Sequence, residues 1–234
     1  MKKGAIIQVR MSSQRFPGKV LHEVAGKTIL QYLLERLECC QCLDVVVVAT
    51  SLEETDIPIA GFCNEYGVRC YRGPLLNVAG RFKEILEIYK FDVFVRISGD
   101  SPLLDPLLIE KGMDMFLNGN YEIVTNVLHR SFPKGQSVEV VNSNTFLQSY
   151  PEIKSVEYRE HVTSFFYKNK ERFKINNFAS NLDAGGIQLS VDTEDDVKIF
   201  EQIVAMMDRP QWQYRWEEIL ELYHSVVNKA KWEN

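Results

Sequence analysis

Short runs of apolar, mostly β-branched residues alternate along the chain with longer segments in which apolar residues recur every three to four positions. The runs at residues 5–9, 44–49 and 92–97 have little polar alternation, which is typical of strands buried on both faces of a parallel sheet. Between the first two runs, residues 28–38 carry a leucine-rich stripe at helical spacing, and Thr28 is a suitable N-cap. The pattern predicts an α/β domain.

The same alternation continues toward the C-terminus. Further helices are expected over residues 57–66 with Gly67 ending the helix, over 78–89, from Asp105-Pro106 onward, and over 157–168, 193–207 and 216–227. Further strands are expected over residues 68–71, 121–127, 137–141 and 187–191. Alternating strands and helices predict a mostly parallel central sheet covered on both faces, with right-handed crossovers.

The chain of 234 residues contains no internal repeat or linker, so we expect a single domain over 1–234. Ligands of such sheets bind beyond the carboxyl ends of the strands. The loops after Val9, Ile97 and Val191 are therefore the places where a site is expected.

Composition narrows the function classes. A net charge of −5 gives no indication of a nucleic-acid-binding surface. No apolar run approaches the roughly 20 residues that span a bilayer, and the first run is too short for a signal peptide, so a cytoplasmic protein is expected. The cysteines clustered at 39–42 lack a second pair at zinc-like spacing, which favours reduced thiols.

The loop after the first strand, residues 10–19, combines the cations Arg10, Arg15 and Lys19 with two serines and a Pro-Gly turn. Backbone N–H groups, hydroxyls and cations are what a triphosphate requires. The spacing is neither that of a P-loop nor that of a dinucleotide fingerprint. Its composition also fits a solvated surface loop, but its position after a strand favours phosphate binding.

Two aspartates follow predicted strands. Asp100 comes directly before Ser101-Pro102, and Asp192 precedes a helix that Thr193 can cap. Mg²⁺ prefers carboxylate and phosphate oxygens, so both aspartates are candidate metal ligands. Asp100 also fits a simple turn, whereas the acidic residues 194–196 are explained by the electrostatics of a helix N-terminus.

The order of residues 6–19 resembles the opening motif of the sugar cytidylyltransferases, most closely the branch named for spore coat polysaccharide biosynthesis protein F. Acylneuraminate and 3-deoxy-manno-octulosonate cytidylyltransferases are more distant relatives. Segments 96–106, 135–140, 159–163 and 189–196 match in the same order over nearly the whole chain. The resemblance implies a three-layer nucleotide-diphospho-sugar transferase fold, which is GT-A-like and Rossmann-type. It also implies a Mg²⁺-dependent transfer of CMP from CTP to a sugar, expected to be a sugar acid, with release of pyrophosphate, for cell-surface polysaccharide synthesis.

The resemblance also implies roles for individual residues. The expected catalytic residues are Arg15, Lys19, Asp100 and Asp192, the two aspartates also being the metal ligands. The expected nucleotide-binding residues are Gln8, Arg10, Met11, Ser12, Ser13, Arg15, Lys19, Arg72, Asn77, Ser98, Gly99 and Asp100. The expected sugar-binding residues are Glu139, Arg159 and His161. No general base is identified, Asp192 acting through the metal or a water being the nearest candidate. A homodimer is expected, with residues 130–154 as a dimerisation or sugar-pocket arm.

The chain departs from the family pattern at Asn77, where Asp is common, and at Gln188, where Arg is usual. Three alternatives therefore stay open: use of another nucleoside triphosphate, a glycosyltransferase on the same fold, or a non-catalytic binding protein. Against the first alternative, this chain lacks the Gly-rich opening of enzymes that use UTP or GTP. Against the second, residues 98–101 do not form the Asp-x-Asp motif that glycosyltransferases commonly carry.

Overall fold

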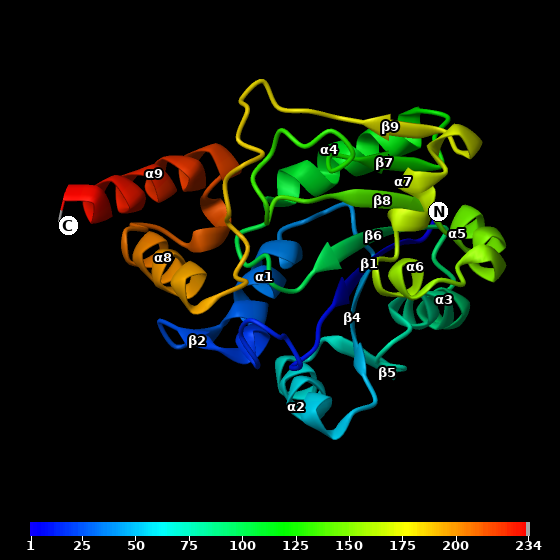
Figure 1. Cartoon of the computed structure of the whole chain (residues 1–234), viewed down its shortest axis with the longest axis horizontal. Coiled ribbons are helices and arrows are strands. Elements are labelled where there is room, and N and C mark those ends of the chain that lie inside the picture. The colour runs from blue at the N-terminus through cyan, green and yellow to red at the C-terminus, as the bar shows by residue number, and fades with distance from the viewer. Residues whose placement is uncertain (233–234) are drawn as a thin grey trace.

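The chain folds around one seven-stranded sheet with the order β5-β4-β1-β6-β8-β7-β9 (Figure 1). The computed structural model describes the backbone of residues 1–232 and the side chains of residues 1–228. The strands of this sheet are β1 (Lys3–Gln8), β4 (Val45–Ser51), β5 (Arg69–Gly73), β6 (Val93–Ser98), β7 (Ile123–Thr125), β8 (Glu139–Asn142) and β9 (Ile175–Asn177). β8 runs antiparallel to both β6 and β7, and the other neighbouring strands are parallel, which confirms a mostly parallel sheet.

Helices cover both faces of the sheet and give the three layers. The helices are α1 (Ile29–Glu38), α2 (Ile57–Tyr66), α3 (Val78–Tyr89), α4 (Pro106–Asn118), α5 (Ser143–Ser149), α6 (Val156–Glu160), α7 (Ser164–Lys168), α8 (Glu194–Ala205) and α9 (Trp216–Trp232). Ala5 and Ile7 of β1 pack with α1, α2 and α4, whereas Ile6 packs with α3, α5 and α7 on the opposite face. This alternation follows from the period of two in a strand.

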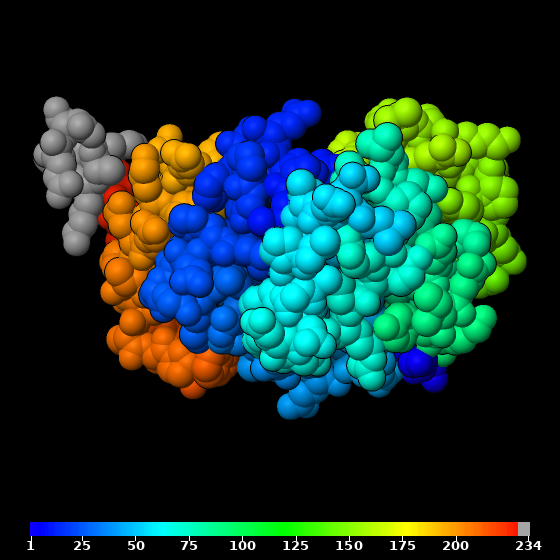
Figure 2. Space-filling model, turned by 90° about the horizontal axis from the view of Figure 1, so that it is seen from below, coloured from blue at the N-terminus to red at the C-terminus, as the bar shows by residue number. Residues whose placement is uncertain are grey.

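The remaining elements are short. A two-stranded hairpin is formed by β2 (Glu23–Val24) and β3 (Lys27–Thr28). Short 3-10 helices lie at Lys19–Leu21, Glu54–Asp56, Tyr150–Glu152, Lys170–Arg172 and Gln211–Gln213. Figures 1 and 2 place the C-terminal helices α8 and α9 at the opposite end of the molecule from α5 and α6, and Figure 1 marks the N-terminus beside α5.

Helix ends follow the capping residues of the sequence. Thr28 accepts a hydrogen bond from the backbone N–H of Gln31, as predicted for the start of α1. Asp105 caps α4, and Pro106 occupies its first turn. Thr193 and Asp196 form a reciprocal capping box at α8, so Asp196 has a structural role.

Two predicted elements are wrong. The helix expected over residues 157–168 is broken at His161–Thr163, where His161 has the non-helical angles φ −103° and ψ 77°. Thr163 instead donates its hydroxyl to Glu139 at 2.6 Å. The strand expected over 187–191 forms only a single bridge to Lys134, because its backbone bonds go to Lys134 and Asp100 rather than to a sheet neighbour.

The structure adds β9, which the sequence pattern did not predict. Over the described residues, none of the helices has the length and apolarity required to cross a bilayer.

Candidate active site

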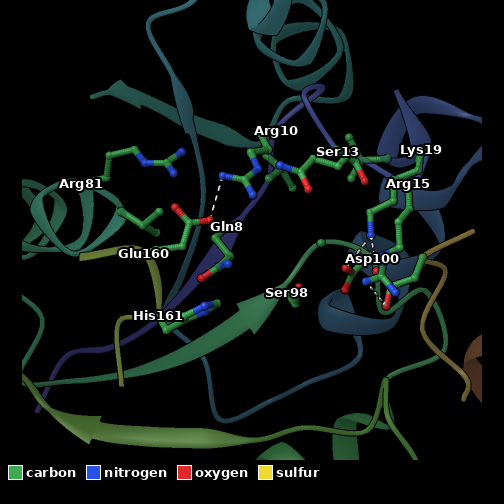
Figure 3. Close-up of a pocket in the computed structure, with 16 residues that line it drawn as sticks. Gln8, Arg10, Ser13, Arg15, Lys19, Arg81, Ser98, Asp100, Glu160 and His161 are labelled. Atoms are coloured by element: carbon green, nitrogen blue, oxygen red, sulfur yellow. Dashed lines mark hydrogen bonds and ion pairs between the residues drawn. The ribbon is translucent and has the colours of Figure 1, made fainter. Parts of the chain in front are cut away.

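A polar cavity of about 550 Å³ opens at the carboxyl ends of β1 and β6 (Figure 3). Its walls come from the loop after β1, the loop after β6, α3, the α6–α7 break and the segment before α8. Its lining residues are Gln8, Val9, Arg10, Ser13, Gln14, Arg15, Lys19, Val20, Val78, Arg81, Ser98, Gly99, Asp100, Glu160, His161 and Asp192. The site therefore lies at the strand ends, as the sequence predicted.

Lys19 connects the two distant aspartates. Its ammonium donates to Asp100 Oδ2 and to Asp192 Oδ1, each at 2.8 Å, while Arg15 lies 3.1 Å from the other oxygen of Asp192. The lysine side chain is 9% exposed, so this contact is poorly screened by solvent. Burial raises the pKa of Asp192, but the hydrogen bond and charge of Lys19, together with Arg15, outweigh it and lower the pKa. Asp192 is therefore held in the charged form and is a poor proton acceptor.

The loop after β1 is held in place by a buried carboxylate that the sequence analysis did not single out. Asp56 accepts the backbone N–H of Met11 at 2.7 Å, and its other oxygen accepts from Thr50 and Ser51. Gly18, at φ 78°, adopts the left-handed conformation that lets the loop turn back, and its N–H donates to the carbonyl of Met11. Lys19 directly follows Gly18 in the chain, so this turn sets the direction of the Lys19 side chain.

Gly99 sets the position of Asp100 through its close approach to β1. A Cβ at this position would lie 2.2 Å from a methyl carbon of Val9 and 3.2 Å from the carbonyl oxygen of Gln8. We expect Gly99→Ala to lower the free energy of unfolding by about 1–3 kcal/mol, because the strand ends must separate. Urea denaturation measures this. Gly61→Ala, at a helical position with no neighbour within 4 Å of the added Cβ, is the matched control and should not be destabilised.

Asp100 and Asp192 fit a divalent cation by their chemistry. Both carboxylates contact a single ammonium, so their oxygens lie close enough to share one ion. Within residues 1–228, no group of three or more Asp, Glu, His or Cys side chains gathers into a complete metal cage. Two carboxylates supplemented by substrate phosphates and water are the usual surroundings of Mg²⁺.

The other end of the cavity is built from different charges. Arg10 pairs with Glu160 at 2.8 Å, and Arg81 lies beside them on α3 (Figure 3). Arg81 is 2% exposed, and its Nε has no hydrogen-bond partner within the described structure. Burial lowers its pKa to about 10, so the guanidinium remains charged at neutral pH. This end of the cavity therefore presents a buried donor.

A second cavity of about 340 Å³ adjoins the first. Ser98, Asp100 and His161 line both. The residues that line only the second cavity are Arg96, Ser101, Val127, Arg130, Lys134, Gly135, Ser137, Glu139, Thr163, Ser164, Tyr167 and Ser190. The hydroxyls among these residues are suited to a polyhydroxylated ligand.

Glu139 and Arg96 form a buried ion pair in the wall of the second cavity. The second carboxylate oxygen of Glu139 accepts from Thr163 and from Tyr167, both at 2.6 Å. Burial opposes ionisation of Glu139, but the charge of Arg96 and these hydrogen bonds lower its pKa below the ordinary value. Arg96 also donates to Gln8 at 3.0 Å, which links this pair to the first cavity.

The structure brings most of the predicted site residues together. Gln8, Arg10, Ser13, Arg15, Lys19, Ser98, Gly99, Asp100 and Asp192 line the first cavity, His161 lines both, and Glu139 lines the second. Four predicted nucleotide-binding residues and one predicted sugar-binding residue, Met11, Ser12, Arg72, Asn77 and Arg159, line neither cavity. The guanidinium of Arg72 donates to the backbone carbonyls of Ser51 and Glu53, and Arg159 is exposed.

The two departures from the family pattern have local structural roles. Asn77 caps α3 through Gly80 and donates to the hydroxyl of Tyr150. Gln188 donates to Asp192 Oδ2 at 3.2 Å, and this hydrogen bond contributes to the lowered pKa of that carboxyl. The amide at position 188 thus orients an aspartate of the site.

Several lining residues were not singled out by sequence reasoning. Arg130 and Lys134 fall within the predicted arm 130–154, but neither they nor Tyr167 carry a local signal, since their neighbours in the cavity come from distant segments. In the sequence, Glu160 also fits the polar face of a helix, and its charged partner Arg10 lies 150 positions away.

The chain is similar to known proteins over most of its length. The family model described as cytidylyltransferase matches residues 4–230. The spore coat polysaccharide biosynthesis protein SpsF of Bacillus subtilis is 30% identical over 214 residues, covering 87% of this chain and 85% of SpsF. A 3-deoxy-manno-octulosonate cytidylyltransferase of Syntrophotalea carbinolica is 37% identical over 106 residues, covering 45% of this chain and 42% of that protein. The structure of a cytidylyltransferase from Leptospira borgpetersenii superposes with a TM-score of 0.92 at 27% identity, covering 97% of this chain and 96% of that chain.

The fold is that of the nucleotide-sugar transferase class. Within that class, the chain belongs to the cytidylyltransferase family, whose model spans nearly its full length. This confirms the resemblance identified from the sequence motifs.

Proposed function

We propose that the protein transfers CMP from CTP to a hydroxyl of an acidic sugar and releases pyrophosphate. The observation that carries this proposal is the convergence of Lys19 on Asp100 and Asp192, with Arg15 beside them, at one end of a cavity sized for a nucleotide. Relatives and a solved structure that are named cytidylyltransferases support CTP as the nucleotide substrate.

The two ends of the first cavity support one orientation of CTP. Arg15 and Lys19 form the cationic end, which suits the triphosphate. At the opposite end, Arg81 lines the cavity, and its guanidinium can donate to a carbonyl oxygen or ring nitrogen of the base. Glu160 can accept from an exocyclic amino group there, which cytosine has and uracil lacks.

The acceptor fits the second cavity, because the wall shared by the two cavities brings its hydroxyl to the α-phosphate. The hydroxyl oxygen forms a bond to the α-phosphorus, and the bond from that phosphorus to the oxygen bridging to the β-phosphate breaks. Pyrophosphate leaves with the electron pair of the broken bond. The hydroxyl proton passes to water, since Asp192 has a lowered pKa.

Asp100 and Asp192 would hold Mg²⁺, which when bound neutralises charge on the phosphate oxygens. The chain's own contribution is positioning and charge. Lys19 and Arg15 stabilise the leaving pyrophosphate, and Gln188 and Gly99 hold the two carboxylates in place.

A pyrophosphate-release assay tests the proposal. Purified protein is incubated with Mg²⁺, one of CTP, UTP, GTP or ATP, and a panel of sugar acids and neutral sugars. We expect release with CTP and an acidic sugar, at least about tenfold faster than with UTP, because Glu160 can accept from the cytosine amino group but not from O4 of uracil. Mass spectrometry should detect the CMP-sugar.

The proposal is wrong if calorimetry detects no binding of CTP with Mg²⁺ and no member of the panel gives pyrophosphate. Faster release with another nucleoside triphosphate would still identify a nucleotidyltransferase, but it would show that cytosine is not the preferred base.

A further inference from the structure

We infer that Arg130, assisted by Lys134, is the residue pair that selects an anionic acceptor by binding its acid group. This inference rests on the proposed function and concerns the second cavity. It names the charge that the acceptor must carry and the side chains that recognise it.

The charges of the second cavity do not cancel. Arg96 is neutralised by Glu139, and Asp100 is neutralised by Lys19. Among the residues that the structure describes, no carboxylate lies within ion-pair distance of Arg130, whose guanidinium contacts only the hydroxyl of Ser137 at 3.2 Å. Burial lowers the pKa of this half-buried arginine. An anion bound here would gain the charge-assisted hydrogen bonds that the protein itself does not supply.

The backbone that carries Arg130 is tightly held. A Cβ at Gly185 would lie 2.6 Å from the carbonyl oxygen of Arg130, so the two backbone segments are already in contact. The next residue, Ser131, accepts the backbone N–H of Ala184 at 2.9 Å, and the aromatic ring of Phe132 packs against that of Trp216. The backbone of Arg130 is thus already ordered before a ligand binds, which lowers the entropy cost of binding.

Lys134 adds a second cation at the rim. It is exposed, and its backbone exchanges hydrogen bonds with Ile187 and Leu189 at 2.8 Å each. Hydroxyl side chains, among them Ser101, Ser137 and Ser190, line the same cavity. The cavity therefore combines two cations with hydroxyl groups, which suits an acidic sugar.

The acid group can be a carboxylate or a phosphate, since both suit an arginine fork. Matched probes separate these sources: 3-deoxy-manno-octulosonate against its methyl ester, and glucose 1-phosphate against glucose. Binding is measured by calorimetry in the presence of Mg²⁺ and the α,β-methylene analogue of CTP, which cannot transfer CMP. We expect at least one acid to bind about 10- to 100-fold more tightly than its neutral partner.

Arg130→Met should weaken binding of that acid about 10- to 100-fold, leave the neutral partner unchanged and leave the affinity for the CTP analogue unchanged. The unchanged nucleotide affinity shows that the variant is folded. Arg130→Lys should recover part of the loss. Arg172→Met, which removes an exposed arginine paired with Glu152 outside both cavities, is the matched control.

Equal binding of acids and neutral partners, binding of no acid by a protein that binds the CTP analogue, or an unaltered Arg130→Met variant would overturn the inference. So would a loss of acid binding in Arg159→Met without a loss in Arg130→Met. All of these outcomes leave the CTP-dependent reaction standing. Failure to bind the CTP analogue would instead refute the proposed function.

Discussion

Asp100→Asn is expected to lower kcat for pyrophosphate release from CTP by about a hundred- to a thousandfold. The substitution keeps the size of the side chain and removes its charge. Asp100 contacts Lys19 at 2.8 Å and lines both cavities, so under the proposed function its charge would act where the two substrates meet. The loss should appear mainly in kcat, because the charge opposes the negative charge of the phosphates unless a cation is bound beside it.

The matched control is Asp195→Asn. Asp195 has an 84% exposed side chain that pairs with Lys198 on the surface of α8, and its removal should leave kcat within twofold of the parent value. Melting temperatures of both variants show whether either is unfolded. If Asp100→Asn released pyrophosphate from CTP at the parent rate, the two-carboxylate arrangement would have no catalytic role. A binding protein would be the better hypothesis only if the parent itself released no pyrophosphate.

Glu139→Gln is expected to lower the free energy of unfolding by about 3–5 kcal/mol at pH 7. The variant leaves Arg96, whose side chain is only 18% exposed, without its counter-charge, which is the most costly way to break an ion pair. Glu157→Gln supplies the comparison, since the pair of Glu157 with Lys168 is more than half exposed on both sides. That variant should change stability by no more than about 1 kcal/mol. Urea denaturation of both proteins measures the difference.

The loss of stability caused by Glu139→Gln should become smaller at low pH. The pKa of Glu139 is lower in the folded protein than in the unfolded chain, so its stabilisation is complete above the ordinary glutamate value of about 4.5 and is lost as the pH falls through the folded value. The parent and the variant should therefore converge in stability below about pH 4.5. A difference that did not change with pH would show that the variant acts through packing rather than charge.

The strand and helix order was predictable wherever one face of an element is apolar. The helix Val78–Tyr89 was predicted at its observed ends, because the stripe that faces the sheet extends over the whole element. The same kind of pattern was misleading at residues 157–168. Val162, Phe165 and Phe166 are all buried, so their spacing continues that of a helix even though the backbone turns at His161.

The candidate site was predictable where its residues stand at strand ends. Lys19, Asp100 and Asp192 each follow a strand or strand-like segment, so topology alone brings them together. Arg72 was predicted to bind the nucleotide, but a sequence does not show that its guanidinium donates to two backbone carbonyls instead of facing the cavity. Arg130 lies in the segment 130–154 predicted as a dimerisation or sugar-pocket arm, but it was not singled out. What distinguishes it is that no carboxylate among the described residues lies within ion-pair distance, and a sequence does not display that.

The two cavities are lined largely by different segments of the chain. The first depends on the loop after β1 and on α3, whereas residues 127–137 and α7 shape the second, and few residues belong to both. Substitutions in residues 127–137 can therefore accumulate during divergence without disturbing the groups that line the first cavity. Under the proposed function, such a partition would let a lineage of these proteins exchange one sugar for another while inheriting the same reaction.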